Sequence, residues 1–344
     1  MEWDIRLNNV HYTARPAQED KEVVDFLDEW YNDLEYVNGK TSGSTGTPKT
    51  IRLLKSDMLA SASLTNRFFQ IDQSSRLLLC LSPTYIAGKM MIVRAIAAGA
   101  ELYTVQPSAN PLLHINGHFD LAAMVPMQVD TILSHPVSFS RFKAIRQVLV
   151  GGAPVSPSLE ERLQQIESAC FATYGMTETV SHVALRALNG PQHADTYFAL
   201  GQIHFSRDER ECLVVHTPHL HEKHFITNDI VSVKDATHFQ WHGRIDHVIN
   251  SGGVKLFPEW IESQLSTLLS QRFFITSQPD ERLGQKAILV IEGHPLSPEK
   301  ENELMGQIRS KLPAYSIPKT IHYLEHFQET YSGKIIRKYD QQSI

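Results

Sequence analysis

Cysteine and long apolar runs are scarce in this sequence, and each shortage excludes a class of protein. Only three cysteines occur in 344 residues, far apart and each with apolar neighbours: Cys80, Cys170 and Cys212. We expect buried thiols in a reducing cytoplasm, not a disulfide or zinc framework. No apolar stretch approaches the roughly 18 residues that cross a bilayer, so we expect no membrane span. The first residues are acidic and polar, unlike a signal peptide.

An excess of positive charge is absent too. The formal net charge of −6 gives no reason to expect nucleic acid or an anionic membrane as a partner. The 17 histidines are scattered, and none stands in an arrangement typical of a metal site. The length and the 42% hydrophobic content are those of a globular chain with a large core, and they predict two domains. The oligomeric state stays open.

The sequence does contain one unusual stretch, residues 41–50. It holds two glycines, six hydroxyl side chains and one lysine, and no apolar side chain larger than proline. Such a stretch cannot join a core, but its N–H groups, hydroxyls and ammonium can surround an anion such as a phosphate. A Walker A loop would need glycine at position 48, where this chain has Pro48. An ordinary P-loop kinase or GTPase is therefore not expected.

Between residues 77 and 173 short apolar runs alternate with helix-like stretches. We expect strands at 77–81, 101–105, 147–150 and 169–173, with helices at 88–98 and 156–166. This alternation predicts a parallel sheet covered on both faces. Further helices are expected at 21–37 and 56–69, and short β pieces over 197–242. Ligands of such sheets gather beyond the carboxyl ends of strands, where Gly151–Gly152 and Tyr174–Gly175 fall.

The pattern changes after residue 243. A helix at 258–269, strands near 272–276, 286–292 and 320–324, and a helix at 298–311 are typical of an α+β domain. We therefore divide the chain into residues 1–243 and 244–344. The predicted fold class is α/β, with a large N-terminal domain built on a parallel sheet with added β structure, and a small, mobile C-terminal α+β domain.

Five stretches together resemble the adenylate-forming superfamily of acyl-CoA synthetases, luciferases and adenylation domains. Residues 41–49 match its pattern T-S-G-[ST]-T-G-x-P-K, and residues 174–178 match Y-G-x-T-E. Residues 243–258 match G-R-x-D-x-x-x-x-S-G-G-x-K-x-x-P, and Gly333–Lys334 the terminal G-K. Residues 225–229 approximate x-x-T-G-D, with Asn228 in place of glycine. A second departure is P-T-Y-I-A-G at 83–88, where many relatives have P-L-F-H-x-x-G.

The resemblance implies ATP, Mg²⁺ and coenzyme A as cofactors and a small carboxylic acid as substrate. It implies Lys334, Glu178 and Thr177 as catalytic residues, with Glu178 as the metal ligand, and Asp246 as the hinge of a rotating C-terminal domain. Tyr174 would face the adenine, Asp229 the ribose hydroxyls, and Arg244 the same sugar or the phosphate. The complete set of implied nucleotide- and CoA-binding residues is Thr41, Ser42, Gly43, Ser44, Thr45, Gly46, Lys49, Gly152, Ala153, Tyr174, Gly175, Asp229, Arg244, Gly252 and Gly253.

Residues 174–186 look most like the compact o-succinylbenzoate–CoA ligases of menaquinone synthesis. That acid has a second carboxylate, for which the candidate partners are Lys89, Arg94, Ser181, His182 and Arg186. The resemblance thus favours an acid–thiol ligase that converts 2-succinylbenzoate to its CoA thioester with release of AMP and pyrophosphate. Two alternatives stay open: a short acyl- or aryl-CoA synthetase for another acid, and a nucleotide-binding homologue without turnover.

Overall fold

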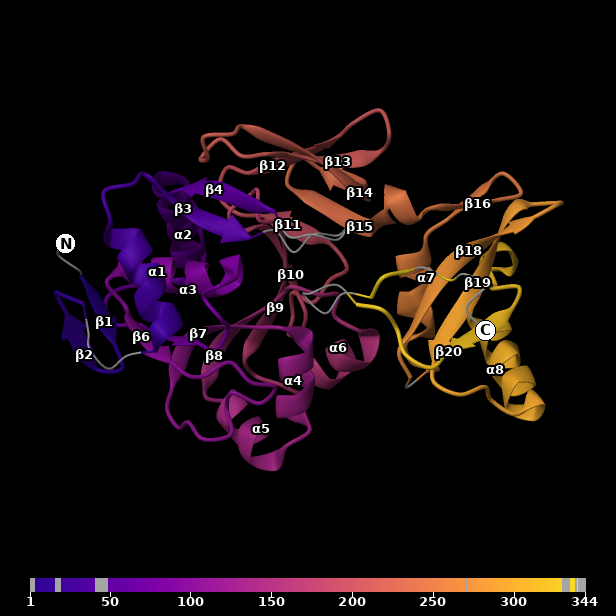
Figure 1. Cartoon of the computed structure of the whole chain (residues 1–344), viewed down its shortest axis with the longest axis horizontal. Helices are drawn as coiled ribbons and strands as arrows, with labels where there is room; N and C mark the ends of the chain where they lie inside the picture. Colours follow the sequence, from indigo (N-terminus) through magenta and orange to yellow (C-terminus); the bar gives the residue numbers. More distant parts are fainter. Residues whose placement is uncertain are drawn as a thin grey trace.

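The computed structural model describes residues 4–15, 20–40, 49–269, 271–329, 335–337 and 339. Over these ranges the chain forms a thirteen-stranded sheet, a five-stranded sheet and a two-stranded hairpin (Figure 1). The strands of the large sheet follow the order β12-β13-β14-β15-β11-β10-β9-β8-β7-β5-β6-β1-β2. The described chain has no helix that is both long and apolar enough to cross a membrane.

Parallel strands form the middle of the large sheet. In spatial order they are β6 (Glu101–Thr104), β5 (Arg76–Leu79), β7 (Phe119–Met124), β8 (Ile145–Val150) and β9 (Ala169–Gly175). Successive side chains enter different apolar clusters: Leu121 packs on one face and Ala122 on the other. Both faces are therefore buried, as the continuous apolar runs predict.

Different helices cover the two faces of this parallel region. The cluster that contains Leu121 also holds side chains of α1 (Lys21–Tyr31), α2 (Lys55–Phe69) and α3 (Ile86–Ala98). The cluster with Ala122 holds those of α4 (Pro126–Leu133), α5 (Pro136–Phe142) and α6 (Pro157–Leu163). Local signals set several helix ends: the Asp20 carboxylate caps the start of α1, and Gly99, at φ +63°, ends α3.

Further strands, most of them antiparallel to their neighbours, extend the sheet at both edges. Beyond β9 lie β10 (His182–Ala187), β11 (Tyr197–Ala199), β15 (His238–Arg244), β14 (His224–Asp235), β13 (Cys212–His216) and β12 (His204–Arg207). At the other edge β1 (Ile5–Leu7) pairs in parallel with β6, and β2 (Val10–Tyr12) pairs with β1. A separate hairpin of β3 (Tyr36–Lys40) and β4 (Thr50–Leu54) flanks residues 41–48, which lie outside the described residues.

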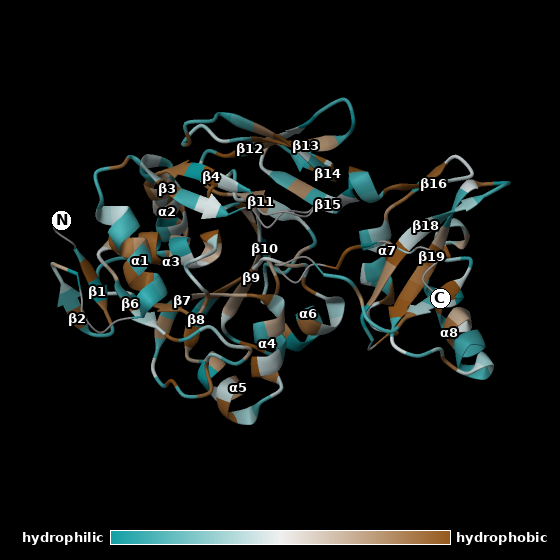
Figure 2. Ribbon diagram, in the orientation of Figure 1, coloured by the Kyte–Doolittle hydropathy of each residue, from teal (hydrophilic) through white to brown (hydrophobic). Residues whose placement is uncertain are grey.

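The C-terminal part has a sheet and a core of its own, drawn in orange and yellow in Figure 1. Its strands are β16 (Ile249–Ser251), β17 (Val254–Leu256), β18 (Phe273–Asp280), β19 (Gly284–Glu292) and β20 (Ile321–Leu324). Helices α7 (Pro258–Leu265) and α8 (Pro298–Lys311) pack on it. Figure 2 shows β19 largely hydrophobic and α8 largely hydrophilic, since α8 buries only Leu304 and Ile308. The predicted fold class is confirmed; the boundary at residue 243 stays a prediction.

Several expected elements differ in extent from those observed. The helix expected at 21–37 ends at Tyr31, and its last residues belong to β3 instead. The strand β7 and the helices α4 and α5 were not expected at all. All three cysteines are buried and free, as predicted, and burial raises the pKa of the Cys80 and Cys170 thiols to about 12.

Candidate active site

Glycines lie at the carboxyl ends of the neighbouring strands β8 and β9. The parallel pairing of these strands reaches Val150 and Ala172, so Gly152, just after β8, and Gly175, the last residue of β9, lie at the same end of the sheet. Gly152 has φ +84° and is exposed together with Ala153, so this backbone is accessible to a ligand. A Cβ on Gly175 would lie only 2.4 Å from the Ser181 carbonyl oxygen. Close packing therefore requires glycine at position 175.

Asp229 lies in a polar contact that joins β9, β14 and β15. The Tyr174 hydroxyl donates to Asp229 Oδ2 over 2.6 Å, and Trp241 Nε1 donates to Oδ1 over 3.1 Å. Burial and the Asp229 carboxylate raise the pKa of Tyr174 well above its ordinary value, so the hydroxyl keeps its proton. Each carboxylate oxygen retains a lone pair for a further donor. No sequence motif marks Trp241; only the pairing of β14 with β15 brings it to the site.

Arg244 on β15 lies opposite Asp229 on β14 in the strand register. Its side chain forms an ion pair with Asp246. Arg244 Nη2 lies 2.7 Å from Asp246 Oδ2, and this contact lowers the pKa of the Asp246 carboxyl. Asn228 Nδ2 donates to the same carboxylate, at 3.2 and 3.3 Å from its two oxygens. Arg210, which belongs to none of the sequence motifs, donates to Asn228 Oδ1 over 3.1 Å. Asn228, which replaces the glycine of the superfamily pattern, thus contacts Asp246, the predicted hinge.

Thr177 and Glu178 lie in the turn between β9 and β10. Met176 N donates to Thr179 Oγ1 and Val180 N to the Thr177 carbonyl, which fixes the turn. The Glu178 side chain is exposed and forms no ion pair with any described residue. No three histidine, cysteine, aspartate or glutamate side chains within the described ranges are arranged to hold a metal ion. Glu178 can therefore supply one carboxylate ligand, and a ligand's own oxygens would have to supply the others.

A buried arginine lies beside the residues that follow this turn. Arg94, on α3, is 2% exposed; its Nη2 donates to Ser181 Oγ over 2.7 Å and lies 3.5 Å from His182 Nδ1. No carboxylate among the described residues pairs with Arg94, and its Nε has no hydrogen-bond partner there. Burial lowers the pKa of Arg94 to about 9. Burial and the neighbouring Arg94 hold the pKa of His182 well below its ordinary range, so the imidazole is neutral.

The other basic candidates for an acid group already have carboxylate partners. Lys89 Nζ is buried 3.1 Å from Glu29 Oε2 and lies over the Phe26 ring. Arg186 forms a two-pronged pair with Glu160, at 2.6 and 2.8 Å. Arg94 is thus the basic candidate without an internal counter-ion within the described structure.

The remaining predicted residues lie apart from this cluster or outside the described residues. Gly252 and Gly253 form the exposed turn between β16 and β17, with φ of +59° and +83°. Lys49 is exposed directly before β4. The predicted Thr41, Ser42, Gly43, Ser44, Thr45 and Gly46, and the predicted Lys334, lie outside the described residues.

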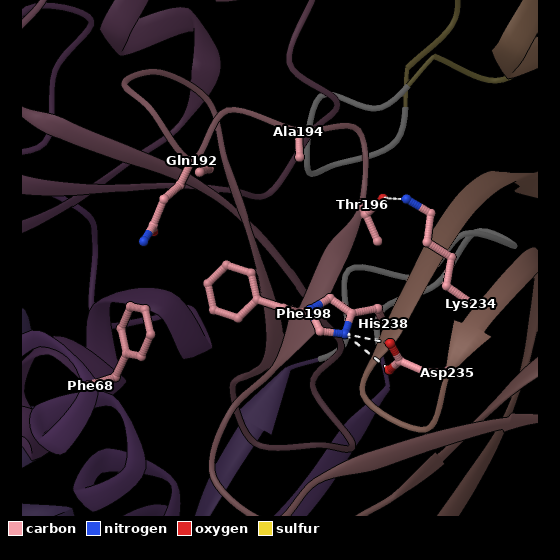
Figure 3. A pocket seen from close by; sticks show the side chains of 9 residues that line it. Phe68, Gln192, Ala194, Thr196, Phe198, Lys234, Asp235 and His238 are labelled. Carbon is pink, nitrogen blue, oxygen red and sulfur yellow. Dashed lines mark hydrogen bonds and ion pairs between the residues drawn. The ribbon is translucent and has the colours of Figure 1, made fainter.

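A cavity of about 590 Å³ lies at the other end of strands β14 and β15 (Figure 3). Phe68 and Phe198 line it, and its polar side chains bond one another: Lys234 donates to Thr196 over 2.8 Å, and Asp235 pairs with His238. The register pairs Asp235 with His238 at this end and Asp229 with Arg244 at the opposite end. The cavity is therefore separate from the predicted site.

Known proteins resemble this chain in both sequence and fold. The family described as "AMP-binding enzyme" matches residues 40–206. A solved structure from Dyadobacter fermentans, described as an acyl-CoA synthetase (AMP-forming)/AMP-acid ligase II-like protein, is 37% identical. The match has a TM-score of 0.64 and covers 94% of each chain.

Two further relatives are named for a single acid. A probable 2-succinylbenzoate–CoA ligase of Mycobacterium tuberculosis is 25% identical over 319 residues, which cover 86% of this chain and 81% of the relative. The O-succinylbenzoate coenzyme A synthetase of Bacillus subtilis, solved in complex with ATP and magnesium ion, matches with a TM-score of 0.70 at 21% identity. That match covers 87% of this chain and 68% of the synthetase, and it shows a shared fold.

Proposed function

Since the chain belongs to the family of AMP-binding enzymes, as an adenylate-forming acid–CoA ligase, we propose that the acid it activates is 2-succinylbenzoate. In the first step a carboxylate of the acid attacks the α-phosphate of ATP, the bond between the α- and β-phosphates breaks, and pyrophosphate leaves. In the second step the CoA sulfur attacks the acyl carbonyl and AMP leaves. The product is the CoA thioester of the acid, a precursor for menaquinone synthesis.

The observation that supports this acid is the buried Arg94 without a carboxylate partner among the described residues. A buried cation is costly unless it is paired and hydrogen-bonded, so a chain that retains one needs an anion from elsewhere. 2-Succinylbenzoate has two carboxylates. One reacts with the α-phosphate, and the second pairs with Arg94, with Ser181 and neutral His182 beside it.

Residues of β9, β14 and β15 would hold the nucleotide. Tyr174, Asp229 and Trp241 form a fixed polar group whose carboxylate can accept the ribose hydroxyls, with Arg244 beside it to donate. Mg²⁺ bound with ATP would neutralise phosphate charge, and the exposed Glu178 carboxylate fits the one or two protein ligands that such an ion uses. Lys334 would stabilise the charge that develops during adenylation.

The proposal includes two orientations of residues 244–344. Rotation about Asp246 would remove Lys334 after adenylation and bring Gly252 and Gly253 beside the acyl-adenylate, where bare backbone leaves room for the CoA thiol. CoA would therefore bind in the second orientation.

A panel of acids tests the proposal. Purified protein with ATP and Mg²⁺ should release pyrophosphate with 2-succinylbenzoate at least tenfold faster, in kcat/KM, than with benzoate, succinate or hexanoate. A preference for a different acid would reject 2-succinylbenzoate and favour the alternative, a short acyl- or aryl-CoA synthetase for that acid. ATP binding without pyrophosphate release from any acid would indicate a homologue without turnover.

Two arginine variants test the role of Arg94. Arg94→Met should lower kcat/KM for 2-succinylbenzoate by about 30-fold or more, since an ion partner of the substrate is lost, and monocarboxylic acids should be affected less than threefold. Arg186→Met is the matched control: it breaks the Glu160 pair and should lower stability without changing the order of preferred acids. Equal losses for all acids in Arg94→Met would contradict the assignment.

A further inference from the structure

The chain that follows residue 334 is attached to the smaller sheet at several described points. Ile335 bridges Glu329 in antiparallel fashion, and Ile336 N donates to the Gln328 carbonyl over 2.8 Å. The Ile335 side chain packs with a small apolar cluster that includes Phe327. Tyr339 Oη lies 2.8 Å from His322 Nδ1 on β20. These contacts fix the chain directly downstream of Lys334, which stands three residues before Arg337.

Arg337 connects this returning chain to α7. Its two guanidinium nitrogens each lie 2.6 Å from a Glu262 oxygen, a planar two-pronged geometry that lysine cannot reproduce. Glu262 Oε1 also accepts from Ile275 N over 2.7 Å, so the carboxylate is held by β18 as well. The pair is largely shielded from solvent, with 22% and 16% of the two side chains exposed.

A second carboxylate on the same face of α7 extends the contact to the junction between the two sheets. Glu259 stands one turn before Glu262, and its Oε1 accepts from His247 Nδ1 and lies 3.9 Å from Arg337 Nη1. Its Oε2 is buried with no hydrogen-bond partner among the described residues, and it lies against Gly243, where a Cβ would come within 2.6 Å. His247 directly follows Asp246 in the short helix Ile245–His247.

We propose that Arg337 is a positioning residue for Lys334: it anchors the described chain directly downstream of that lysine to α7 and, through Glu259 and His247, to the junction at Asp246. The inference rests on the proposed function, because it assigns the effect of Arg337 to the adenylation step. Arg337 touches no reacting atom. Its loss lets the chain downstream of Lys334 move relative to α7, so the lysine reaches the α-phosphate less often.

We expect the variant that removes the guanidinium to retain the fold, for a physical reason. Burial raises the pKa of Glu262 to about 7, although Arg337 acts to lower it. Without Arg337 the carboxyl group takes up a proton instead of remaining as an unpaired buried charge. Arg337→Met is therefore a usable test, and Glu262→Gln, which retains the side-chain volume, is a second.

The test measures the two half-reactions separately in Arg337→Met, Arg337→Lys and Glu262→Gln. Arg337→Met should lower kcat for pyrophosphate release at least tenfold with KM for ATP within threefold, and thioester formation from supplied acyl-adenylate should fall less than threefold. The kcat of Arg337→Lys for pyrophosphate release should lie between those of the parent and Arg337→Met. Tyr339→Phe is the matched control, since it removes one hydrogen bond to β20 two residues beyond Arg337 and leaves the Arg337–Glu262 pair in place, and both its rates should stay within threefold of the parent.

Three outcomes overturn the inference: equal losses in both half-reactions, full activity in Arg337→Met, or an equal defect in Tyr339→Phe. Amide hydrogen exchange supplies a readout that does not depend on turnover. Arg337→Met should accelerate exchange over residues 328–339 at least tenfold, and β18 should stay protected. If no acid supports pyrophosphate release, the proposed function fails, and unchanged exchange over residues 328–339 would then reject the positioning role by itself.

Discussion

Asn228 donates from its side-chain amide to both oxygens of Asp246, at 3.2 and 3.3 Å. The superfamily pattern has glycine at the position of Asn228, and the predicted hinge is Asp246. The residue that departs from the pattern and the predicted hinge are therefore in direct contact. Because Arg244 pairs with the same carboxylate, Asp246 is held from two directions, and a rotation about it would have to break or carry along both contacts.

Replacing Asn228 with glycine should release one of these two contacts. We expect Asn228→Gly to speed thioester formation from supplied acyl-adenylate two- to fivefold and to change pyrophosphate release less than twofold. The free energy of unfolding should fall by about 1–2 kcal/mol, since hydrogen bonds and backbone restriction are lost. Separate half-reaction rates and urea unfolding measure these effects. A slower second step in the variant would contradict the role of this contact in restraining Asp246.

The Tyr174 hydroxyl contributes to stability through a charged acceptor. Tyr174→Phe removes the 2.6 Å bond to Asp229 and leaves that carboxylate one donor short. We expect the free energy of unfolding to fall by about 1.5–3 kcal/mol, the usual range for a hydrogen bond to a charged group, and KM for ATP to rise. Urea unfolding and ATP titration check both. Tyr315→Phe, at an exposed ring, is the control and should change neither quantity.

His182 makes stability dependent on pH in the acidic range. Its pKa is lowered in the folded chain, so unfolding takes up a proton once the pH falls below the ordinary value of 6.5. Stability is thus fully present above pH 6.5 and should decline below it by up to about 1.4 kcal/mol per pH unit from this group. Urea unfolding of His182→Gln should be measured between pH 5 and 7.5. Below pH 6.5 its free energy of unfolding should change less with pH than that of the parent, by up to the same amount per pH unit. An unchanged slope would mean that His182 is not held neutral, and exposed His294→Gln provides the comparison.

Gly175 and Gly306 should respond to alanine in opposite ways. A Cβ at position 175 would lie 2.4 Å from a backbone oxygen, whereas one at position 306, within α8, meets no atom within 4 Å. We expect Gly175→Ala to lower the free energy of unfolding by about 3 kcal/mol and to reduce pyrophosphate release. Gly306→Ala should raise stability by about 0.5–1 kcal/mol, since glycine is unfavourable in a helix. Calorimetric unfolding of both variants measures the difference, and a stable Gly175→Ala would refute the packing reason.

Local signals explain which elements could be predicted from the sequence. The helix expected at 298–311 has the bounds of α8, because Ser297 caps it and Pro298 suits its first position. The strand β7 was missed because its six residues, FDLAAM, contain no β-branched side chain and only one aromatic ring. The helix expected at 21–37 was too long, since the pattern cannot show that Val37 packs in a strand.

Some residues of the candidate site could be predicted from motifs, and others are revealed only by the tertiary structure. Motifs identified Tyr174, Asp229 and Arg244, and the structure brings these three together. Trp241 and Arg210 could not be found in this way, because strand pairing and a turn bring them there and no motif includes them. Arg94 was only one of several basic candidates. Arg94 differs from the other basic candidates because no carboxylate among the described residues pairs with it. That difference depends on tertiary packing, so the sequence could not reveal it.

The buried thiols have a practical consequence for following the reaction. Free coenzyme A is consumed as a thiol, and a reagent that colours on reaction with thiols would report its disappearance. Cys80, Cys170 and Cys212 are shielded from such a reagent, and burial keeps all three protonated, with raised pKa values. The folded chain should therefore add almost no background colour. The same three thiols should react only on unfolding, which provides an internal count of denatured molecules in each sample.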